Sequence, residues 1–308
     1  MSWPLLLAAA AVAAAAAEVP SLPDNRSAEV LKLQPARDDQ LTVPVTIEGQ
    51  GPFRFTIDTG SQATVLSTLL ADRLMLNDRK TALLVGMVSS QSVETTYIPE
   101  FSLGKRSFPI RLAPLVEPAN IGGGADGILG TDSLQGQRVL IDFKKQQIIV
   151  SDARELGGDR GFEIIVKARQ KLGQLIITHA YVDGVRTALL IDTGSPLSIG
   201  NPALRRKLQS ARKLGEARIT DVNGTEVSGL TFEAQSLEIG RASVTNFPIV
   251  FADAPLFAVL GLTDEPAMVL GMNELKVFKR VAIDFEQRRI LFDVPAEAER
   301  QSVAWHMF

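Results

Sequence analysis

An internal repeat constrains the fold of this chain more than any other feature of its sequence. Four landmarks occur twice, in the same order. They are Asp-Thr-Gly-Ser at 58–61 and 192–195, an apolar segment ending in glycine at 127–130 and 268–271, an apolar segment ending in Asp-Phe at 139–143 and 281–285, and a closing apolar strand at 147–150 and 289–292. The chain is therefore predicted to be a duplicated domain, with copies at 40–152 and 160–294.

The residues around each Asp-Thr-Gly-Ser segment predict β structure with short helices. In each copy two alternating strands joined by a turn precede the segment, and a short helical pattern follows it. The expected strands are 43–47 and 51–57 in the first copy and 175–182 and 185–191 in the second, and the expected helices are 67–74 and 202–208. The predicted fold class is therefore mainly β.

Length and composition limit the chemistry that the chain can perform. Its 308 residues exceed one ordinary domain of roughly 100 to 200 residues, so two core-forming units are expected. The net charge of -3 and the shortness of the basic runs at 144–145 and 205–207 give no electrostatic case for a nucleic-acid partner. The chain has no cysteine and two histidines, which excludes a disulfide scaffold, thiol catalysis and cysteine-ligated metals. Any catalysis must rest on carboxylates, hydroxyls or backbone amides.

The N-terminus carries an apolar run at 5–17 that ends in three alanines. The run is shorter than the roughly 20 residues of a membrane span, and small residues at its end are typical of a signal-peptidase site. We therefore predict a signal peptide at 1–17, an exported (periplasmic or secreted) protein, a linker at 18–39 and a tail at 295–308. An uncleaved membrane anchor or a low-complexity tail is the alternative, because no Lys or Arg precedes the run.

The two Asp-Thr-Gly triplets are the strongest candidates for a functional site. A tight turn is the plain alternative, because Asp and Thr side chains bond local backbone and glycine tolerates unusual dihedral angles. A turn explains one copy well and two copies poorly, since each triplet follows an apolar strand that should bury its carboxylate. A buried carboxylate is costly unless it is paired or used. The triplets therefore favour a functional pair.

The sequence resembles the retropepsin-like and pepsin-like aspartic peptidases, whose lobes each present apolar-apolar-Asp-Thr-Gly-Ser and later apolar-apolar-Gly. Here the second element stands at 128–130 and 269–271. The resemblance covers about residues 40–294 and implies two acid-protease lobes that flank one cleft, each a six-strand type of β barrel or sandwich with short helices. The chain has short lobes and lacks the cysteine bridges that are common in secreted pepsins. In these respects it resembles a bacterial-type exported member with both lobes on one chain.

The resemblance implies an aspartic endopeptidase with Asp58 and Asp192 as its catalytic residues. Two carboxylates about 3 Å apart cannot both ionise, so they share one proton. The ionised member then takes a proton from a water between them, while the protonated member polarises the scissile carbonyl and later protonates the leaving amine. This chemistry needs no metal, no other cofactor and no covalent nucleophile.

The neighbours of the two aspartates acquire supporting roles through the same resemblance. The hydroxyls of Thr59 and Thr193 are expected to bond across the lobe interface. Gly60 and Gly194 are expected to let backbone amides approach the carboxylates. We also expect the hydroxyls of Ser61 and Ser195 to donate to the outer carboxylate oxygens, which would favour ionisation. Ordinary turn roles for these threonines and serines are the alternative.

The family also implies flaps, which are β-hairpins that cover the cleft. In the second copy Asn223-Gly224 lies between two strand patterns, which is a strong hairpin signal. In the first copy the corresponding softer turn contains Ser89 and Ser90. Two flaps are therefore expected. The apolar segment at 255–262 is expected to be a loop that rims the cleft.

Several functional readings stay open at this stage. The favoured one is a monomeric endopeptidase with a peptide or protein substrate, in contact with a membrane only if the N-terminal segment is retained. The alternative is a non-catalytic peptide-binding or scaffold protein of the same fold. A protease built from two copies of this chain and a processing enzyme restricted to one partner protein complete the set. Specificity is not encoded in the motifs themselves.

Overall fold

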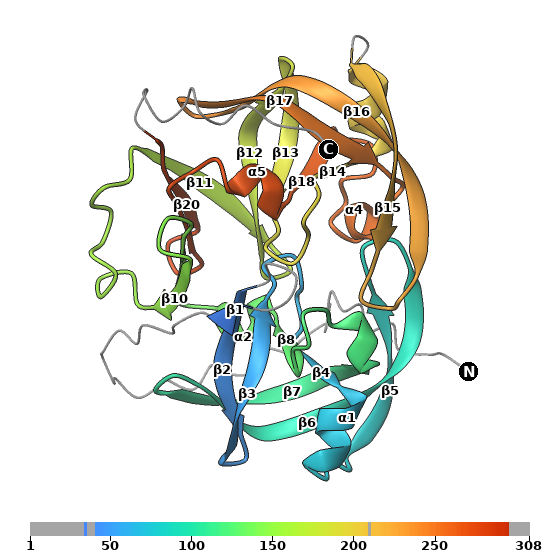
Figure 1. The fold of residues 1–308 in the computed structure, drawn as a ribbon, viewed down its shortest axis with the longest axis vertical. Coiled ribbons are helices and arrows are strands. Elements are labelled where there is room, and N and C mark those ends of the chain that lie inside the picture. The colour runs from blue at the N-terminus through green and yellow to red at the C-terminus, as the bar shows by residue number, and fades with distance from the viewer. Residues whose placement is uncertain (1–33, 36–40, 209–210, 296–308) are drawn as a thin grey trace.

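The computed structural model describes residues 34–35, 41–208 and 211–295 (Figure 1). The predicted signal peptide at 1–17 lies outside the described residues, as do most of the predicted linker at 18–39 and all but the first residue of the predicted tail at 295–308. The described part of the chain is mainly β, with two sheets and short helices. This confirms the predicted fold class.

The first lobe is an eight-stranded sheet in the order β1-β2-β3-β8-β4-β7-β6-β5. Because β2 also pairs with β6, the strands β2, β3, β8, β4, β7 and β6 close into a ring. The strands are β1 Gln34–Pro35, β2 Leu41–Ile47, β3 Gln50–Ile57, β4 Val65–Ser67, β5 Arg79–Val85, β6 Ser90–Leu103, β7 Arg106–Val116 and β8 Gly127–Leu129. The helices are α1 Thr68–Arg73 and α2 Thr131–Leu134, with a 3-10 turn, η1, at Pro118–Asn120.

The second lobe repeats this ring, since β12 pairs with both β13 and β16 and the order between them is β13-β18-β14-β17-β16. Its strands are β12 Gln174–Val182, β13 Val185–Ile191, β14 Ile199–Gly200, β15 Arg212–Thr220, β16 Glu226–Ile239, β17 Ala242–Phe251 and β18 Ala267–Leu270. Its helices are α3 Pro202–Lys207, α4 Pro255–Val259 and α5 Met272–Leu275. The segment expected to be a loop at 255–262 therefore contains a helix, because Pro255 fixes a helical φ at its first position.

A further set of strands connects the two copies (Figure 1). They are β9 Arg138–Asp142, β10 Gln147–Ser151, β11 Ile164–Lys171, β19 Arg280–Asp284 and β20 Arg289–Asp293. The first-copy strand β9 pairs antiparallel with its second-copy counterpart β19, so that Arg138 lies opposite Asp284 and Arg280 opposite Asp142. Strands that the sequence assigns to the first copy thus belong to the same sheet as the second lobe.

Local sequence explains why the elements next to each Asp-Thr-Gly loop form. In β3 the alternation of side chains buries Phe53, Phe55 and Ile57 in the core. Helix α1 begins where the Ser67 hydroxyl caps it by accepting from the Leu70 N–H. Helix α3 begins in the same way at Asn201, which is followed by a proline at the first helical position.

Among the described residues, no helix combines the length and the apolar character that a membrane span requires.

Candidate active site

Each Asp-Thr-Gly loop is held by a strand that is directly followed by a glycine. Strand β3 pairs parallel with β8, and β13 pairs parallel with β18. As a result the Asp58 N–H donates to the Leu129 carbonyl at 3.1 Å, and the Asp192 N–H donates to the Leu270 carbonyl at 3.0 Å. The two loops are therefore anchored to their lobes by equivalent backbone hydrogen bonds.

The glycines that follow β8 and β18 are required by close backbone packing. A Cβ on Gly130 would lie 2.4 Å from the Ala63 carbonyl oxygen, and one on Gly271 would lie 2.5 Å from the Leu197 carbonyl oxygen. No side chain fits at those distances, so the glycine of the second motif brings each loop against its supporting strand.

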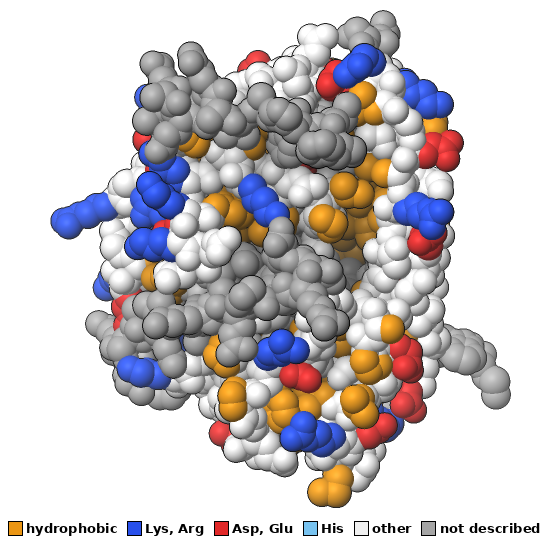
Figure 2. Space-filling model, in the orientation of Figure 1, with side chains coloured by type: hydrophobic (Ala, Val, Ile, Leu, Met, Phe, Trp, Pro, Cys, Tyr) orange, Lys and Arg blue, Asp and Glu red, His pale blue; other side chains and the backbone are white. Residues whose placement is uncertain are grey.

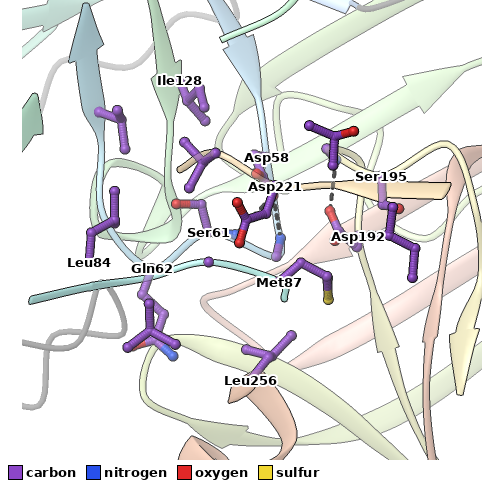
Figure 3. A pocket seen from close by; sticks show the side chains of 18 of the residues that line it. Asp58, Ser61, Gln62, Leu84, Met87, Ile128, Asp192, Ser195, Asp221 and Leu256 are labelled. Atoms are coloured by element: carbon purple, nitrogen blue, oxygen red, sulfur yellow. Dashed lines mark hydrogen bonds between the residues drawn. The ribbon is translucent and has the colours of Figure 1, made fainter. Parts of the chain in front are cut away.

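The structure brings the carboxyl groups of Asp58 and Asp192 to the same cavity (Figure 3), where each lies against the glycine of the opposite loop. Asp58 Oδ1 accepts from the backbone N–H groups of Gly60 at 2.8 Å and Ser61 at 2.9 Å. Asp192 Oδ1 accepts from the Gly194 N–H at 2.8 Å. One carboxyl group from each lobe thus meets in a single site, as the sequence predicts.

Burial and mutual repulsion control the charge of this pair. Burial raises the pKa of Asp192 well above its ordinary value, and the nearby charge of Asp58 raises it further. Burial also raises the pKa of Asp58, but the hydrogen bond from Asp192 and the two backbone N–H groups oppose that rise. Asp58 is half-buried, whereas Asp192 is 4% exposed. We therefore expect the pair to share one proton, and the greater exposure of Asp58 favours the negative charge on that residue.

Gly60 and Gly194 are required by the opposite carboxylate. A Cβ on Gly60 would lie 2.5 Å from Asp192 Cγ, and a Cβ on Gly194 would lie 2.4 Å from Asp58 Cγ. Both glycines also supply an N–H to the aspartate of their own loop. The sequence interpretation, that glycine allows the amide to approach, is therefore only part of the reason: each glycine also leaves room for the other lobe.

Thr59 and Thr193 join the two loops across the lobe interface. The Thr59 hydroxyl donates to the Ile191 carbonyl at 2.9 Å, and the Thr193 hydroxyl donates to the Ile57 carbonyl at 2.7 Å. Each hydroxyl also accepts from the backbone N–H of the other threonine, at 3.1 and 3.3 Å. The geometry matches the cross-lobe role expected from the sequence, and the four bonds fix the two aspartates relative to each other.

The hydroxyls of Ser61 and Ser195 do not take the role expected from the sequence. Ser61 Oγ donates to the Ala63 carbonyl and Ser195 Oγ donates to the Leu197 carbonyl, both at 2.8 Å. The carboxylates bond instead to the backbone N–H groups of the same serines. The physical reason is that each loop curls so tightly that the nearest acceptor for the hydroxyl is the carbonyl two residues later.

Because the two serine hydroxyls bond carbonyl groups, removing them should leave the charge of the aspartates unchanged. The Ser61→Ala/Ser195→Ala variant keeps both backbone N–H groups, so the acidic limb of its kcat/KM profile should stay at the wild-type pH. Its free energy of unfolding should fall by about 1 kcal/mol for each lost hydroxyl bond. A pH profile on one peptide substrate, together with urea unfolding, checks both results. A limb that moves toward neutral pH would show that the hydroxyls act on the aspartates after all.

Two hairpins extend over the aspartates from opposite lobes, and we call them the first flap (β5, β6 and the turn at 86–89) and the second flap (β15, β16 and the turn at 221–225). The predicted turn residues Ser89, Asn223 and Gly224 lie at the two tips, and Ser90 begins β6 opposite Val85. The tips meet each other (Figure 1). The role of these hairpins as flaps stays a prediction.

Polar side chains join the flap tips. Asp221 Oδ2 accepts from the Ser89 hydroxyl at 2.7 Å and from the Val88 N–H at 3.2 Å. The side-chain amide of Asn223 donates to the Ser89 hydroxyl at 2.9 Å. A Cβ on Gly86 would lie 2.4 Å from Asp221 Oδ2, so a side chain at this position would displace the Asp221 carboxylate. Our sequence analysis missed Asp221, although an aspartate two residues before Asn-Gly is a typical start of a turn.

The aspartates, the loop residues and the flap tips enclose a cavity of about 150 Å³ (Figure 3). Its apolar lining comes from both lobes and both flaps, and includes Val65, Leu84, Met87, Ile128, Ile219 and Leu256. Leu256 belongs to α4, so the segment at 255–262 does reach the cavity as expected. Figure 2, drawn in the orientation of Figure 1, shows apolar side chains gathered in a hollow on the right of the molecule, in the region of α4. In the described part of the chain no group of three or more His, Cys, Asp or Glu side chains could hold a metal ion.

Glu274 is a buried acid behind the second Asp-Thr-Gly loop that our sequence analysis did not identify. It lies in α5 with 1% of its surface exposed, and its carboxyl group bonds the Ser198 hydroxyl. Ser198 in turn accepts from the Gly271 N–H at 3.1 Å. Burial raises the pKa of Glu274 to about 7. No local sequence signal distinguishes it from the exposed glutamates.

This raised pKa predicts how stability changes with pH. The folded state holds the Glu274 proton up to about pH 7, whereas the unfolded chain releases it near 4.5. The stabilisation of the folded state by the protonated Glu274 is therefore fully present below about pH 4.5 and is lost as the pH rises through 7. The loss amounts to about 3 kcal/mol.

Glu274→Gln should remove this dependence, because glutamine stays neutral at every pH. We expect the variant to match the wild type near pH 4.5 and to be more stable above pH 7. Urea unfolding of both proteins between pH 4.5 and 8 measures the difference, and Glu286→Gln, at an exposed position, controls for the substitution itself. A difference that is the same at all pH values would contradict the raised pKa.

Comparison with known proteins agrees with this geometry. A family model described as aspartyl protease matches residues 43–133 and 178–273. Each match contains one Asp-Thr-Gly-Ser loop, one flap, and the supporting strand (β8 or β18) with the glycine that follows it. A search of curated proteins finds no match. Because the two matches cover more than half of the chain and fall on its two lobes, the chain belongs to the aspartyl protease family.

Proposed function

We propose that this protein is an aspartic endopeptidase that hydrolyses peptide bonds with a water activated by Asp58 and Asp192. The observation that carries the proposal is the convergence of the Asp58 and Asp192 carboxyl groups, one from each lobe, on a cavity that residues of both flaps also line. A pair that shares one proton has both an acid and a base within reach of the same substrate bond. Membership of the aspartyl protease family supports hydrolysis of peptides in general.

The two residues take different parts in the proposed reaction. Asp58, on which the charge is favoured, accepts a proton from the attacking water as that water adds to the scissile carbonyl carbon. Asp192, whose pKa burial raises most, donates its proton to the carbonyl oxygen. The resulting gem-diol collapses when Asp58, now protonated, gives its proton to the leaving nitrogen, the C–N bond breaks and Asp192 takes a proton from a gem-diol hydroxyl. The products are a carboxylic acid and an amine, and the shared proton is restored to the pair.

The cavity indicates how a substrate would bind. Apolar side chains from both lobes and both flaps line it, so we propose that it receives an extended peptide with apolar side chains next to the scissile bond. The polar contacts between the flap tips must open for a polypeptide to enter. Both aspartates come from one chain, which supports a monomeric enzyme.

Digestion of a peptide library in oxygen-18 water tests this function. We expect new C-termini that carry one oxygen-18 atom, as direct attack by water requires, and no products with Asp192→Asn. Cleavage at one or very few sequences would support a restricted processing enzyme. Peptides that bind to the wild type but are not cut at any pH from 3 to 8 would support the non-catalytic peptide-binding alternative and overturn the proposal.

A further inference from the structure

Gln174 is a buried polar residue that reaches from the second lobe to the first Asp-Thr-Gly loop. It is the first residue of β12, and 1% of its surface is exposed. Its side-chain amide Nε2 donates to the Gly60 carbonyl oxygen. This orientation follows from chemistry, because a carbonyl oxygen can only accept and only the NH₂ end of the glutamine amide can donate. Gln174 therefore forms a cross-lobe contact next to Asp58.

The contact with Gly60 acts on Asp58 through one peptide group. The Gly60 carbonyl and the Ser61 N–H belong to the same planar peptide unit, so fixing one fixes the other. The Ser61 N–H donates to Asp58 Oδ1 at 2.9 Å. A hydrogen bond to a peptide oxygen also polarises the unit and strengthens its N–H as a donor. Gln174, the Gly60–Ser61 peptide and Asp58 thus form a continuous chain of hydrogen bonds.

The turn before Gln174 is itself anchored to the first lobe. The side-chain amide of Gln135, just after α2, donates to the Gly173 carbonyl at 3.1 Å and accepts from the Gln170 amide at 2.7 Å. A Cβ on Gly173 would lie 2.9 Å from Thr131 Oγ1, and Gly173 has a φ of +84°. The anchoring groups are neutral, so they hold Gln174 in place whatever the pH.

A role in packing alone does not explain this arrangement. Gln174 Oε1 is buried and has no hydrogen-bond partner within the described residues. A buried unpaired acceptor costs about 1 to 3 kcal/mol, so an apolar residue of the same length would suit a purely structural position better. The unpaired Oε1 therefore indicates that the Nε2 bond to the Gly60 carbonyl, rather than packing, is what this position requires a glutamine for.

We propose that Gln174 is a positioning residue for Asp58, which it keeps as the ionised member of the pair by fixing and polarising the Gly60–Ser61 peptide. The inference rests on the proposed function of the pair, but it concerns a residue outside both Asp-Thr-Gly motifs. Through Gln174 the second lobe stabilises the charge on the aspartate of the first lobe.

The test replaces Gln174 by methionine, which has nearly the same length and no donor. Weakening the Ser61 donor raises the lower apparent pKa of the pair, so the acidic limb of kcat/KM should move toward neutral pH. We expect a loss of about threefold on that limb and little loss on the plateau. Gln287→Met is the control, because it makes the same substitution at an exposed glutamine in the turn between β19 and β20.

A second readout keeps the inference separate from the proposed function. Carbon-13 NMR titration of the Asp58 carboxyl group, assigned with Asp58→Asn, needs no hydrolysis, and the Ser61 amide proton shift reports the strength of its hydrogen bond. We expect both to change in Gln174→Met and not in Gln287→Met. If Gln174→Met fails to fold, Gln174→Leu takes its place. Equal changes in the Gln174 and Gln287 variants, or no change in either, would overturn the proposal even if the wild type cleaves peptides.

Discussion

Replacing Asp58 by Asn, Asp192 by Asn, or both should lower peptide hydrolysis to nearly the same residual rate in all three variants. The reason is that in the proposed mechanism the two carboxyl groups share one proton, so removing either one removes the acid and the base together. Effects of residues that act as one unit are strongly non-additive, and we expect a loss of at least about 10³-fold in kcat for each variant. Single-turnover assays on one library-derived peptide measure it.

Stability measurements on the same variants serve as the control. Asparagine keeps the size of aspartate and removes a buried charge, so each variant should unfold at a urea concentration no lower than the wild type. Losses of activity that multiply in the double variant would show that the two aspartates act independently, and the shared-proton mechanism would then be wrong.

Replacing Arg138 by Met should cost about 3 kcal/mol of stability, because it removes the shorter of two ion pairs of the buried Asp284 and leaves only Arg289, at 3.5 Å. The Arg138 guanidinium has 1% of its surface exposed and donates to Asp284 Oδ2 at 2.7 and 3.2 Å. Asp284 is fully buried on β19, in the other copy of the repeat. Its second oxygen accepts from the Gln287 N–H at 2.8 Å. The midpoint of urea unfolding measures the effect.

Two further variants separate charge from packing. Arg138→Met/Asp284→Asn should recover most of the lost stability, because asparagine carries no charge and still accepts from the Gln287 N–H. Arg280→Met removes the repeat counterpart of Arg138, whose side chain is 28% exposed, and should cost about 1 kcal/mol or less through its ion pair with Asp293. If Arg280→Met cost as much as Arg138→Met, burial of the ion pair would not be the cause.

The sequence predicted those features that depend on short stretches of chain. The alternation in 51–57 and 185–191 is a local pattern, and both segments form strands with the aspartates at their ends. The caps of α1 and α3 likewise lie next to the residues that they satisfy. The duplicated motifs predicted one aspartate from each lobe in one site, because two equivalent lobes place equivalent loops about one axis.

The sequence did not predict the contacts that join segments far apart in the chain. A serine hydroxyl has several acceptors within reach, and only the curl of the loop decided that Ser61 bonds the Ala63 carbonyl rather than Asp58. Asp221 meets Ser89 only because the two flaps approach each other, and Gln174 meets Gly60 only because a turn of one lobe lies against a loop of the other.

The sequence by itself therefore determined the repeat, the strands and the pair of aspartates, since these follow from side-chain periodicity and from turn chemistry over a few residues. The tertiary structure alone decided the pairing of β9 with β19, the burial of Arg138 against Asp284 and the raised pKa of Glu274. The physical reason is that burial and hydrogen-bond partners are properties of the packed molecule. The same glutamate or arginine is ordinary at the surface, and its energy changes only when distant segments remove it from water.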